Sequence, residues 1–123
     1  MFNETTLVGR ITRDAEVGEV PNVHHTPRLR FTLAVDREHA VDGQTSADFW
    51  PVELVGEHGL RLAPHLTRGR LLLVNGPTHI DERRDTEGRR HVFPYLTVRH
   101  IRFLDHKPGS VSETNSAAAA EQG

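Results

Sequence analysis

Residues Asp48–Gly56 read DFWPVELVG, and this stretch decides the fold of the chain. In an extended strand successive side chains point to opposite faces. Trp50, Val52 and Leu54 therefore share one face, which the alternating pattern predicts to be the core face. Phe49 takes the opposite face, where a large aromatic ring is unexpected unless it has a partner. The stretch predicts a half-buried strand that presents one exposed ring.

Two more strands are predicted upstream of this stretch. The first covers about Thr5–Thr12, and the second covers about Arg28–Arg37. Period-two alternation in the second strand predicts an inner set and an outer set of side chains. The inner set is Leu29, Phe31, Leu33 and Val35, and the outer set is Arg28, Arg30 and Thr32.

A short helix and two long strands are predicted downstream. The apolar spacing of Glu57–Leu66 suits one helix face (Leu60, Leu62, Ala63 and Leu66), and Pro64 limits the helix to a few turns. Strands are predicted over Arg70–Ile80 and His91–Leu104, joined by a charged hairpin tip at Asp81–Arg90. This order predicts an all-β fold: a five-stranded barrel with one short helix between strands 3 and 4.

The chain divides by composition into one domain and a tail. Residues 1–105 hold all of the predicted elements, whereas residues 106–123 are rich in Ser, Ala and Glu. A segment with so little apolar surface cannot offset its ordering entropy, so we expect a disordered C-terminal tail. The domain is close to the usual size of a single domain.

Composition excludes several classes of protein. No apolar run approaches the ~20 residues of a membrane span, and no signal-peptide pattern opens the chain. Cysteine is absent, so disulfides and thiolate metal sites are not expected, and we expect a cytoplasmic protein. The formal net charge is −2, with 15 basic and 17 acidic residues. An anionic partner must therefore be held by a local basic patch.

Neither a metal site nor a catalytic site is predicted. The chain has nine histidines, but none lies at ligand spacing with a carboxylate partner of the usual kind. The sequence has no nucleophile beside a base, no phosphate-binding glycine loop and no paired carboxylates. We expect no cofactor, no metal and no enzymatic activity.

Several short motifs together resemble one known family. They are Leu7–Asp14 (LVGRITRD), Phe31–Val35 (FTLAV), Asp48–Val52 (DFWPV), Gly69, Gly76 and Asp85–Gly88 (DTEG). In this order and spacing they resemble bacterial single-stranded DNA-binding proteins over residues 1 to about 105. The resemblance implies an OB fold, a homotetramer and sequence-independent wrapping of single-stranded DNA. It also implies a role in DNA replication, recombination or repair.

The chain departs from the family's pattern at its stacking positions. Of up to four positions at which the family stacks bases on aromatic rings, only Phe49 keeps a Phe, Tyr or Trp side chain; the others fall on His39, Val55 and Arg83. Glu53 lies on the face expected to meet DNA. The family's acidic Pro-Phe terminus is replaced by Ala119–Gly123 (AAEQG), so recruitment of repair enzymes through the tail is not expected. The pattern indicates a divergent or accessory member.

Candidate DNA-binding residues follow from side-chain chemistry. Arginine is suited to phosphate contact and to stacking on bases, and aromatic rings stack on any base. Phosphates are expected to meet Arg10, Arg28, Arg30, Arg37, Arg89 and Arg90, and bases to stack on Phe49 with help from His39 and Arg83.

Each of these assignments has an alternative. Phe49 could fill a subunit interface, and the charged hairpin could simply neutralise itself. The outward apolar positions Val55, Phe93 and Tyr95 are expected to be partly buried between subunits of a closed homo-oligomer. The alternative for the whole chain is an OB-fold protein-interaction module, such as a primosome-like assembly subunit.

Overall fold

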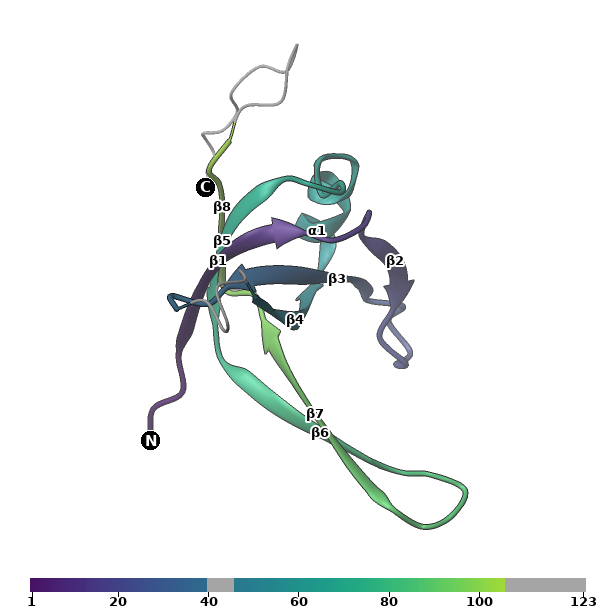
Figure 1. The fold of residues 1–123 in the computed structure, drawn as a ribbon. Coiled ribbons are helices and arrows are strands. Elements are labelled where there is room, and N and C mark those ends of the chain that lie inside the picture. The colour runs from purple at the N-terminus through teal and green to yellow at the C-terminus, as the bar shows by residue number, and fades with distance from the viewer. Residues whose placement is uncertain (40–45, 106–123) are drawn as a thin grey trace.

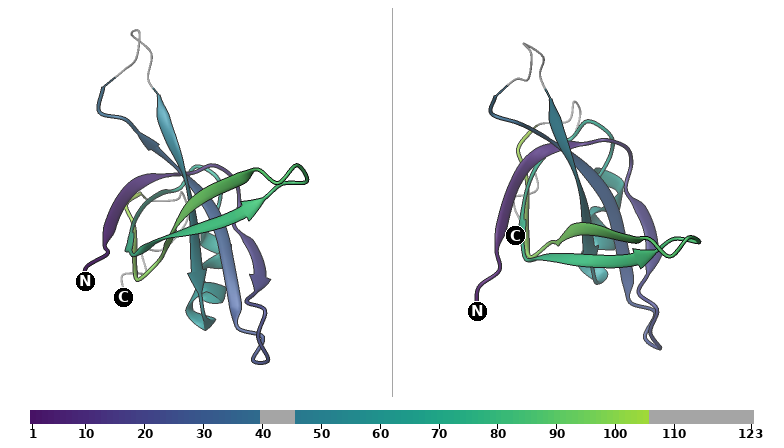
Figure 2. Two further views of the ribbon diagram at one scale, coloured as in Figure 1. Left: turned by 90° about the horizontal axis from the view of Figure 1, so that it is seen from below. Right: turned by 60° about the horizontal axis from the view of Figure 1, so that its bottom comes forward.

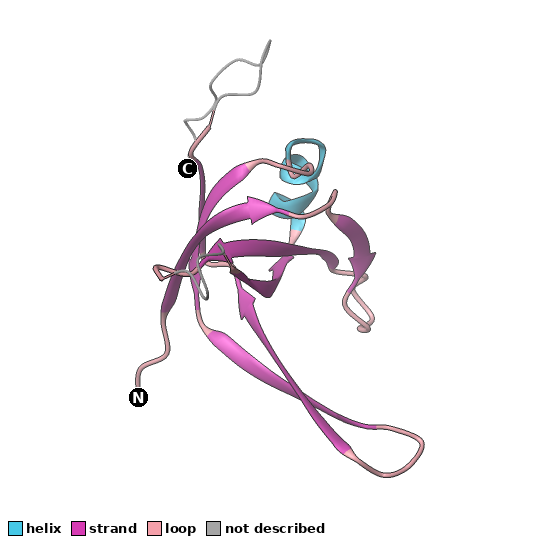
Figure 3. Cartoon of the chain, in the orientation of Figure 1, coloured by secondary structure: helices cyan, strands magenta, loops and turns pink. Residues whose placement is uncertain are grey.

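The computed structural model describes residues 1–39 and 46–105, and the predicted tail, 106–123, lies outside them. Eight strands and one short α-helix form from the described residues (Figures 1 and 3). In chain order they are β1 (Thr5–Ile11), β2 (Glu16–Glu19), β3 (Pro27–Asp36), β4 (Ala47–Val55), α1 (Glu57–Leu62), a 3₁₀ turn (Ala63–His65), β5 (Leu71–Gly76), β6 (Thr78–Arg84), β7 (Arg90–Thr97) and β8 (His100–Phe103).

The strands form one curved sheet in the order β6-β7-β4-β3-β1-β5-β8, with β2 paired on β3. All pairs are antiparallel except β4 with β7. The path does not close, because β6 and β8 stand unpaired with each other at its two ends. This is the arrangement of a partly open OB-fold barrel. It confirms the predicted all-β class and the short helix that follows β4.

The core consists of apolar residues from β1, β3, β4, β5 and β7, together with the residue that follows the 3₁₀ turn. Its buried members are Ile11, Leu29, Phe31, Leu33, Val52, Leu54, Leu66, Leu72, Val74 and Leu96. Burying one such aliphatic side chain stabilises the fold by roughly 1.5–3 kcal/mol relative to its exposure. The alternation predicted for β3 is confirmed, with Val35 only partly buried at the end of the strand.

Strand β4 has the predicted phase. Val52 and Leu54 are buried, Trp50 is partly buried at the same face, and Phe49 is 66% exposed. Its pairing with β3 runs from Arg28↔Val55 to Asp36↔Ala47, so each outer residue of β3 lies opposite an outer residue of β4.

The helical segment packs on the core through three of the four predicted residues, Leu62, Ala63 and Leu66, and also through Gly59. A Cβ atom on Gly59 would lie 2.7 Å from a methyl of Leu54 and 3.0 Å from a methyl of Leu29, so the helix backbone itself rests on the core. Leu60, predicted to face the core, is exposed instead. The prediction that Pro64 limits the helix is confirmed, because α1 ends at Leu62 and continues only as a 3₁₀ turn.

Each of the last two predicted strands is divided in the structure. Pro77 separates β5 from β6, and the chain passes from the barrel into a hairpin that projects from it (Figures 1 and 2). At this point Gly76 approaches the neighbouring chain closely, since a Cβ there would lie 1.9 Å from the carbonyl oxygen of Thr97. The hairpin strands reach Arg84 and Arg90, so the tip is shorter than the predicted Asp81–Arg90.

A partly buried ion pair fixes the end of the domain. Arg70 Nε donates to Asp105 at 3.1 Å, and its guanidinium lies 4.5 Å from the ring centroid of Phe103. The second oxygen of Asp105 accepts the backbone N–H of Leu71 at 3.2 Å. Burial raises the pKa of Asp105, but the hydrogen bonds from Leu71 and Arg70 outweigh burial and leave that pKa below its ordinary value.

We predict that Asp105→Ala lowers the free energy of unfolding by about 1–3 kcal/mol at neutral pH, because it leaves an 11% exposed Arg70 without its counter-ion. Since the folded pKa of Asp105 is depressed, this stabilisation is present above the unfolded pKa and is lost as pH falls through the folded pKa. Urea unfolding monitored by circular dichroism at several pH values measures both effects.

Asp36→Ala is the matched control, because Asp36 is an exposed aspartate at the end of β3. Its effect on stability should stay within about 0.5 kcal/mol. The account of the ion pair is contradicted if the two variants are equally stable at neutral pH, or if acidification widens the gap between Asp105→Ala and the unmodified chain.

Candidate nucleic-acid interface

The outer faces of β4 and β7 form one continuous surface. Their parallel pairing places Val52 beside Leu96 and Glu53 beside Thr97. Val52 and Leu96 are buried, so Glu53 and Thr97 mark the outer face, where the Thr97 hydroxyl donates to Glu53 at 3.2 Å. Odd-numbered residues of both strands therefore share this surface.

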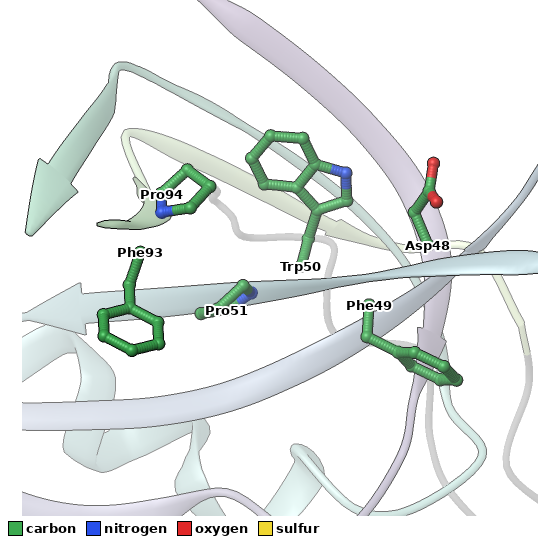
Figure 4. A pocket seen from close by; sticks show the side chains of 6 residues that line it. All are labelled: Asp48, Phe49, Trp50, Pro51, Phe93 and Pro94. Atoms are coloured by element: carbon green, nitrogen blue, oxygen red, sulfur yellow. The ribbon is translucent and has the colours of Figure 1, made fainter. Parts of the chain in front are cut away.

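An open pocket of about 370 Å³ lies where the two strands diverge. Asp48, Phe49, Trp50, Pro51, Phe93 and Pro94 line it. Figure 4 shows the rings of Phe49 and Phe93 on one side of β4 with Pro51 between them, while Trp50 and Pro94 lie on the other side. A second exposed ring, Phe93, thus lines the same pocket as Phe49, which the sequence did not reveal.

Four rings share one face of the β6–β7 hairpin: His91, Phe93 and Tyr95 along β7, and His79 opposite Tyr95 on β6. Phe93 stacks on His91 with centroids 6.3 Å apart and planes at 22°, and Tyr95 contacts His79 with centroids 5.5 Å apart. Phe93 and Tyr95 were expected at a subunit interface, and neither histidine was a candidate. The signal that could have found them is the period-two spacing of His91, Phe93 and Tyr95.

Arg10, Arg28 and Arg30 lie on the outer face together with Phe49. Arg10 pairs in register with Ala34, which pairs with Phe49, so the small alanine separates the cation from the ring. Among the described residues, none of the three arginines forms an ion pair with a carboxylate. The Arg10 guanidinium donates to the carbonyl of Gly69 at 3.0 Å.

Arg30 has acidic neighbours on both sides. In register it lies opposite Glu16 of β2 and Glu53 of β4, and side chains directly opposite each other are about 5 Å apart at Cβ. Arg28 lies opposite Gly18 and Val55 and has no such neighbours. The electrostatic environment of Arg28 is therefore more favourable for a phosphate than that of Arg30.

Arg37 lies apart from this surface. Arg37 donates twice to one oxygen of Asp48, at 2.8 and 3.0 Å, and this contact raises the pKa of the guanidinium. Asp48 lies on the Trp50 side of β4 (Figure 4). His39 is exposed beside the part of the chain that the structure does not describe.

Three of the four hairpin arginines, all of them candidates, are neutralised by nearby carboxylates. Arg83 pairs with Asp81 at 3.1 Å, Arg90 with Glu82 at 2.6 Å, and Arg89 with both Asp85 and Glu87. Hydrogen bonds from His91 and from the Arg89 backbone lower the pKa of Asp85. These are the contacts expected of a self-neutralised hairpin, so Arg83, Arg89 and Arg90 would have to leave these carboxylates in order to contact a phosphate.

Within residues 1–39 and 46–105, no helix is long and apolar enough to cross a membrane.

Comparison with known proteins assigns the chain to a family. Residues 2–104 match the model of the single-strand binding protein family. A "Single-stranded DNA-binding protein" of Thermotoga maritima is 36% identical over 117 residues, which cover 92% of this chain and 82% of that protein. "Single-stranded DNA-binding protein 2" of Clostridium acetobutylicum is 33% identical over 104 residues, covering 85% of this chain and 77% of that protein.

A third relative, "Single-stranded DNA-binding protein 2" of Staphylococcus aureus (strain COL), is 32% identical over 108 residues, covering 87% of this chain and 76% of that protein. The family's description names binding and no reaction, which agrees with the prediction that the chain is not an enzyme. The matched region coincides with the barrel and its hairpin, and it confirms the family resemblance of the sequence motifs. This chain belongs to the single-strand binding protein family.

Proposed function

We propose that this chain binds single-stranded DNA without sequence preference, with bases stacked on Phe49 and phosphates held first by Arg28, then by Arg30 and Arg10. The observation that carries the proposal is a 66% exposed ring on the same sheet face as three arginines that form no ion pair within the described part of the chain. Aromatic platforms and cationic grooves are the two parts that single-strand binders combine. The names of the relatives support the same ligand.

Binding is expected to depend more on charge than on stacking. One stacked base contributes roughly 1–3 kcal/mol, and two family stacking positions hold Val55 and Arg83 here. His39, Arg37, Arg83, Arg89 and Arg90 complete the proposed site, with the four arginines released from their carboxylates as phosphates replace them. The proposed setting is the cytoplasm, in DNA replication, recombination or repair.

One set of observations favours a second function, that of a protein-interaction module on the same fold. Glu16 and Glu53 flank Arg30, and the hairpin cations are neutralised locally. A surface of this kind resists a polyanion more than the surface of a strongly basic binder does. The two functions differ in whether the chain binds an oligonucleotide at low salt.

We predict that affinity for a fluorescent oligo-dT falls steeply with salt, because each phosphate met by arginine releases counter-ions. Phe49→Ala should weaken binding by about 1–3 kcal/mol with little change of the salt slope. Arg28→Ala with Arg30→Ala should flatten that slope by about one unit per lost phosphate contact. Fluorescence anisotropy at several salt concentrations measures all three quantities.

Two matched variants control this experiment. Phe2→Ala removes an exposed ring outside the sheet, and Arg102→Ala removes an exposed cation on β8. Both should bind as the unmodified chain does. Folded protein that shows no binding at low salt would reject the DNA-binding function and leave the protein-interaction module.

The proposed assembly is a homotetramer. Exposed apolar side chains on several strands, such as Val8, Ile80 and Val92, support burial between copies. We predict that light scattering at micromolar concentration gives a mass near four times the 13.8 kDa of one chain. A mass of a single chain would contradict this assembly.

Residues 1–105 are proposed to form the complete DNA-binding domain. We predict that deleting residues 106–123 leaves both the melting temperature and the affinity for oligo-dT nearly unchanged, because every proposed contact lies before residue 106. Thermal unfolding and the same anisotropy titration provide the comparison. A loss of several degrees, or a clear loss of affinity, would show that the segment takes part in folding or binding.

A further inference from the structure

We propose that Phe93 and Tyr95 are DNA-stacking residues that extend the platform of Phe49 along β7. This inference rests on the proposed function and specifies where the bases go beyond Phe49. It concerns strand β7, whereas the stacking positions compared in the sequence lie on other segments of the chain.

The pairing between β4 and β7 places the rings on one face. Val52 pairs with Leu96 and Glu53 with Thr97, and towards their N-terminal ends the two strands diverge, with Phe49 and Pro51 on one and Phe93 and Tyr95 on the other. Phe49, Pro51 and Phe93 line the same open pocket (Figure 4). A strand of nucleic acid that follows this face from Phe49 therefore passes Pro51 and reaches Phe93.

The spacing along β7 gives each ring a separate base. Phe93 and Tyr95 are two residues apart on one face, which in a strand is roughly 6.6 Å. Phe93 is 49% exposed, and Tyr95 is partly exposed. Two neighbouring rings can thus each offer a face to solvent without sharing the same base.

Imidazole neighbours hold both rings before DNA arrives. His91 stacks on Phe93, and His79 contacts Tyr95 from the opposite strand of the hairpin. A side chain that is already restricted loses less conformational freedom on binding, so the entropic cost of binding is smaller. The rings are therefore better prepared for stacking than isolated surface aromatics are.

The charge of this face also permits a polyanion to approach. Asp81 lies opposite Phe93 in register, but its carboxylate pairs with Arg83 at 3.1 Å. Glu53 accepts a hydrogen bond from Thr97 at the other end of the row. Arg28 and Arg30 lie on β3, one strand beyond β4, and Arg30 is opposite Glu53, whose neighbour in register on β7 is Thr97, so cations border the same face.

The test separates the ring from simple apolar packing. Phe93→Leu and Tyr95→Leu keep apolar volume and remove the ring, whereas Phe93→Tyr and Tyr95→Phe keep the ring. In the full chain, each Leu variant should weaken oligo-dT binding by about 5- to 160-fold, which is 1–3 kcal/mol, with an unchanged salt slope. The ring-keeping variants and Phe2→Leu should bind as the unmodified chain does.

Photocross-linking to an oligonucleotide that carries 5-iodouracil locates the contact directly. Trypsin cleaves after Arg90 and Arg99, so one peptide of residues 91–99 contains both rings. The proposal expects cross-linked nucleotide on this peptide and its loss in the double Leu variant.

Three outcomes would overturn the inference in distinguishable ways. If the Leu variants bind normally while Phe49→Ala binds weakly, stacking stops at Phe49 and the proposed function stands. If the Leu variants change the mass in light scattering without changing DNA affinity, the rings belong to a contact between copies of the chain. If the unmodified, folded chain binds no oligo-dT at low salt, the proposed function fails together with the inference.

Discussion

The pairing of β3 with β4 is the constraint on which the rest of the structure depends. Its register runs the whole length of β4, so the inner side chains Leu29, Leu33 and Val52 are buried together in one core. The same register forces Arg28, Arg30 and Phe49 to the outer face. Slipping the register by one residue would exchange the two faces. Fold stability and the candidate DNA surface therefore share one cause.

Strand β7 connects this surface to the hairpin. It joins β4 through only a short parallel pairing and then diverges, and the pocket lies where the two strands separate. The close approach of Gly76 to Thr97 and the break at Pro77 direct the chain into the hairpin.

The acidic residues of the hairpin are matched with arginines, so a chain with net charge −2 still presents a face that is open to a polyanion.

Local periodicity was sufficient to predict the all-β fold, the helix after β4 and the outward position of Phe49. It was not sufficient for features that depend on pairing between distant strands. The acidic neighbours of Arg30 come from β2 and β4. Phe93, which lines the same pocket as Phe49, comes from β7. Leu60 was misassigned because the adjacent Gly59, which carries no hydrophobic signal, takes the packed position on α1.

The central claim is that single-stranded DNA lies along the outer faces of β3, β4 and β7. Amide chemical-shift mapping by NMR, with ²H,¹⁵N-labelled full chain and an oligo-dT, tests it most directly. The account predicts shifts concentrated around Arg28, Arg30, Phe49, Phe93 and Tyr95, with β8 nearly unaffected. Shifts confined to β2 and β8, or no shifts under low-salt conditions, would contradict it.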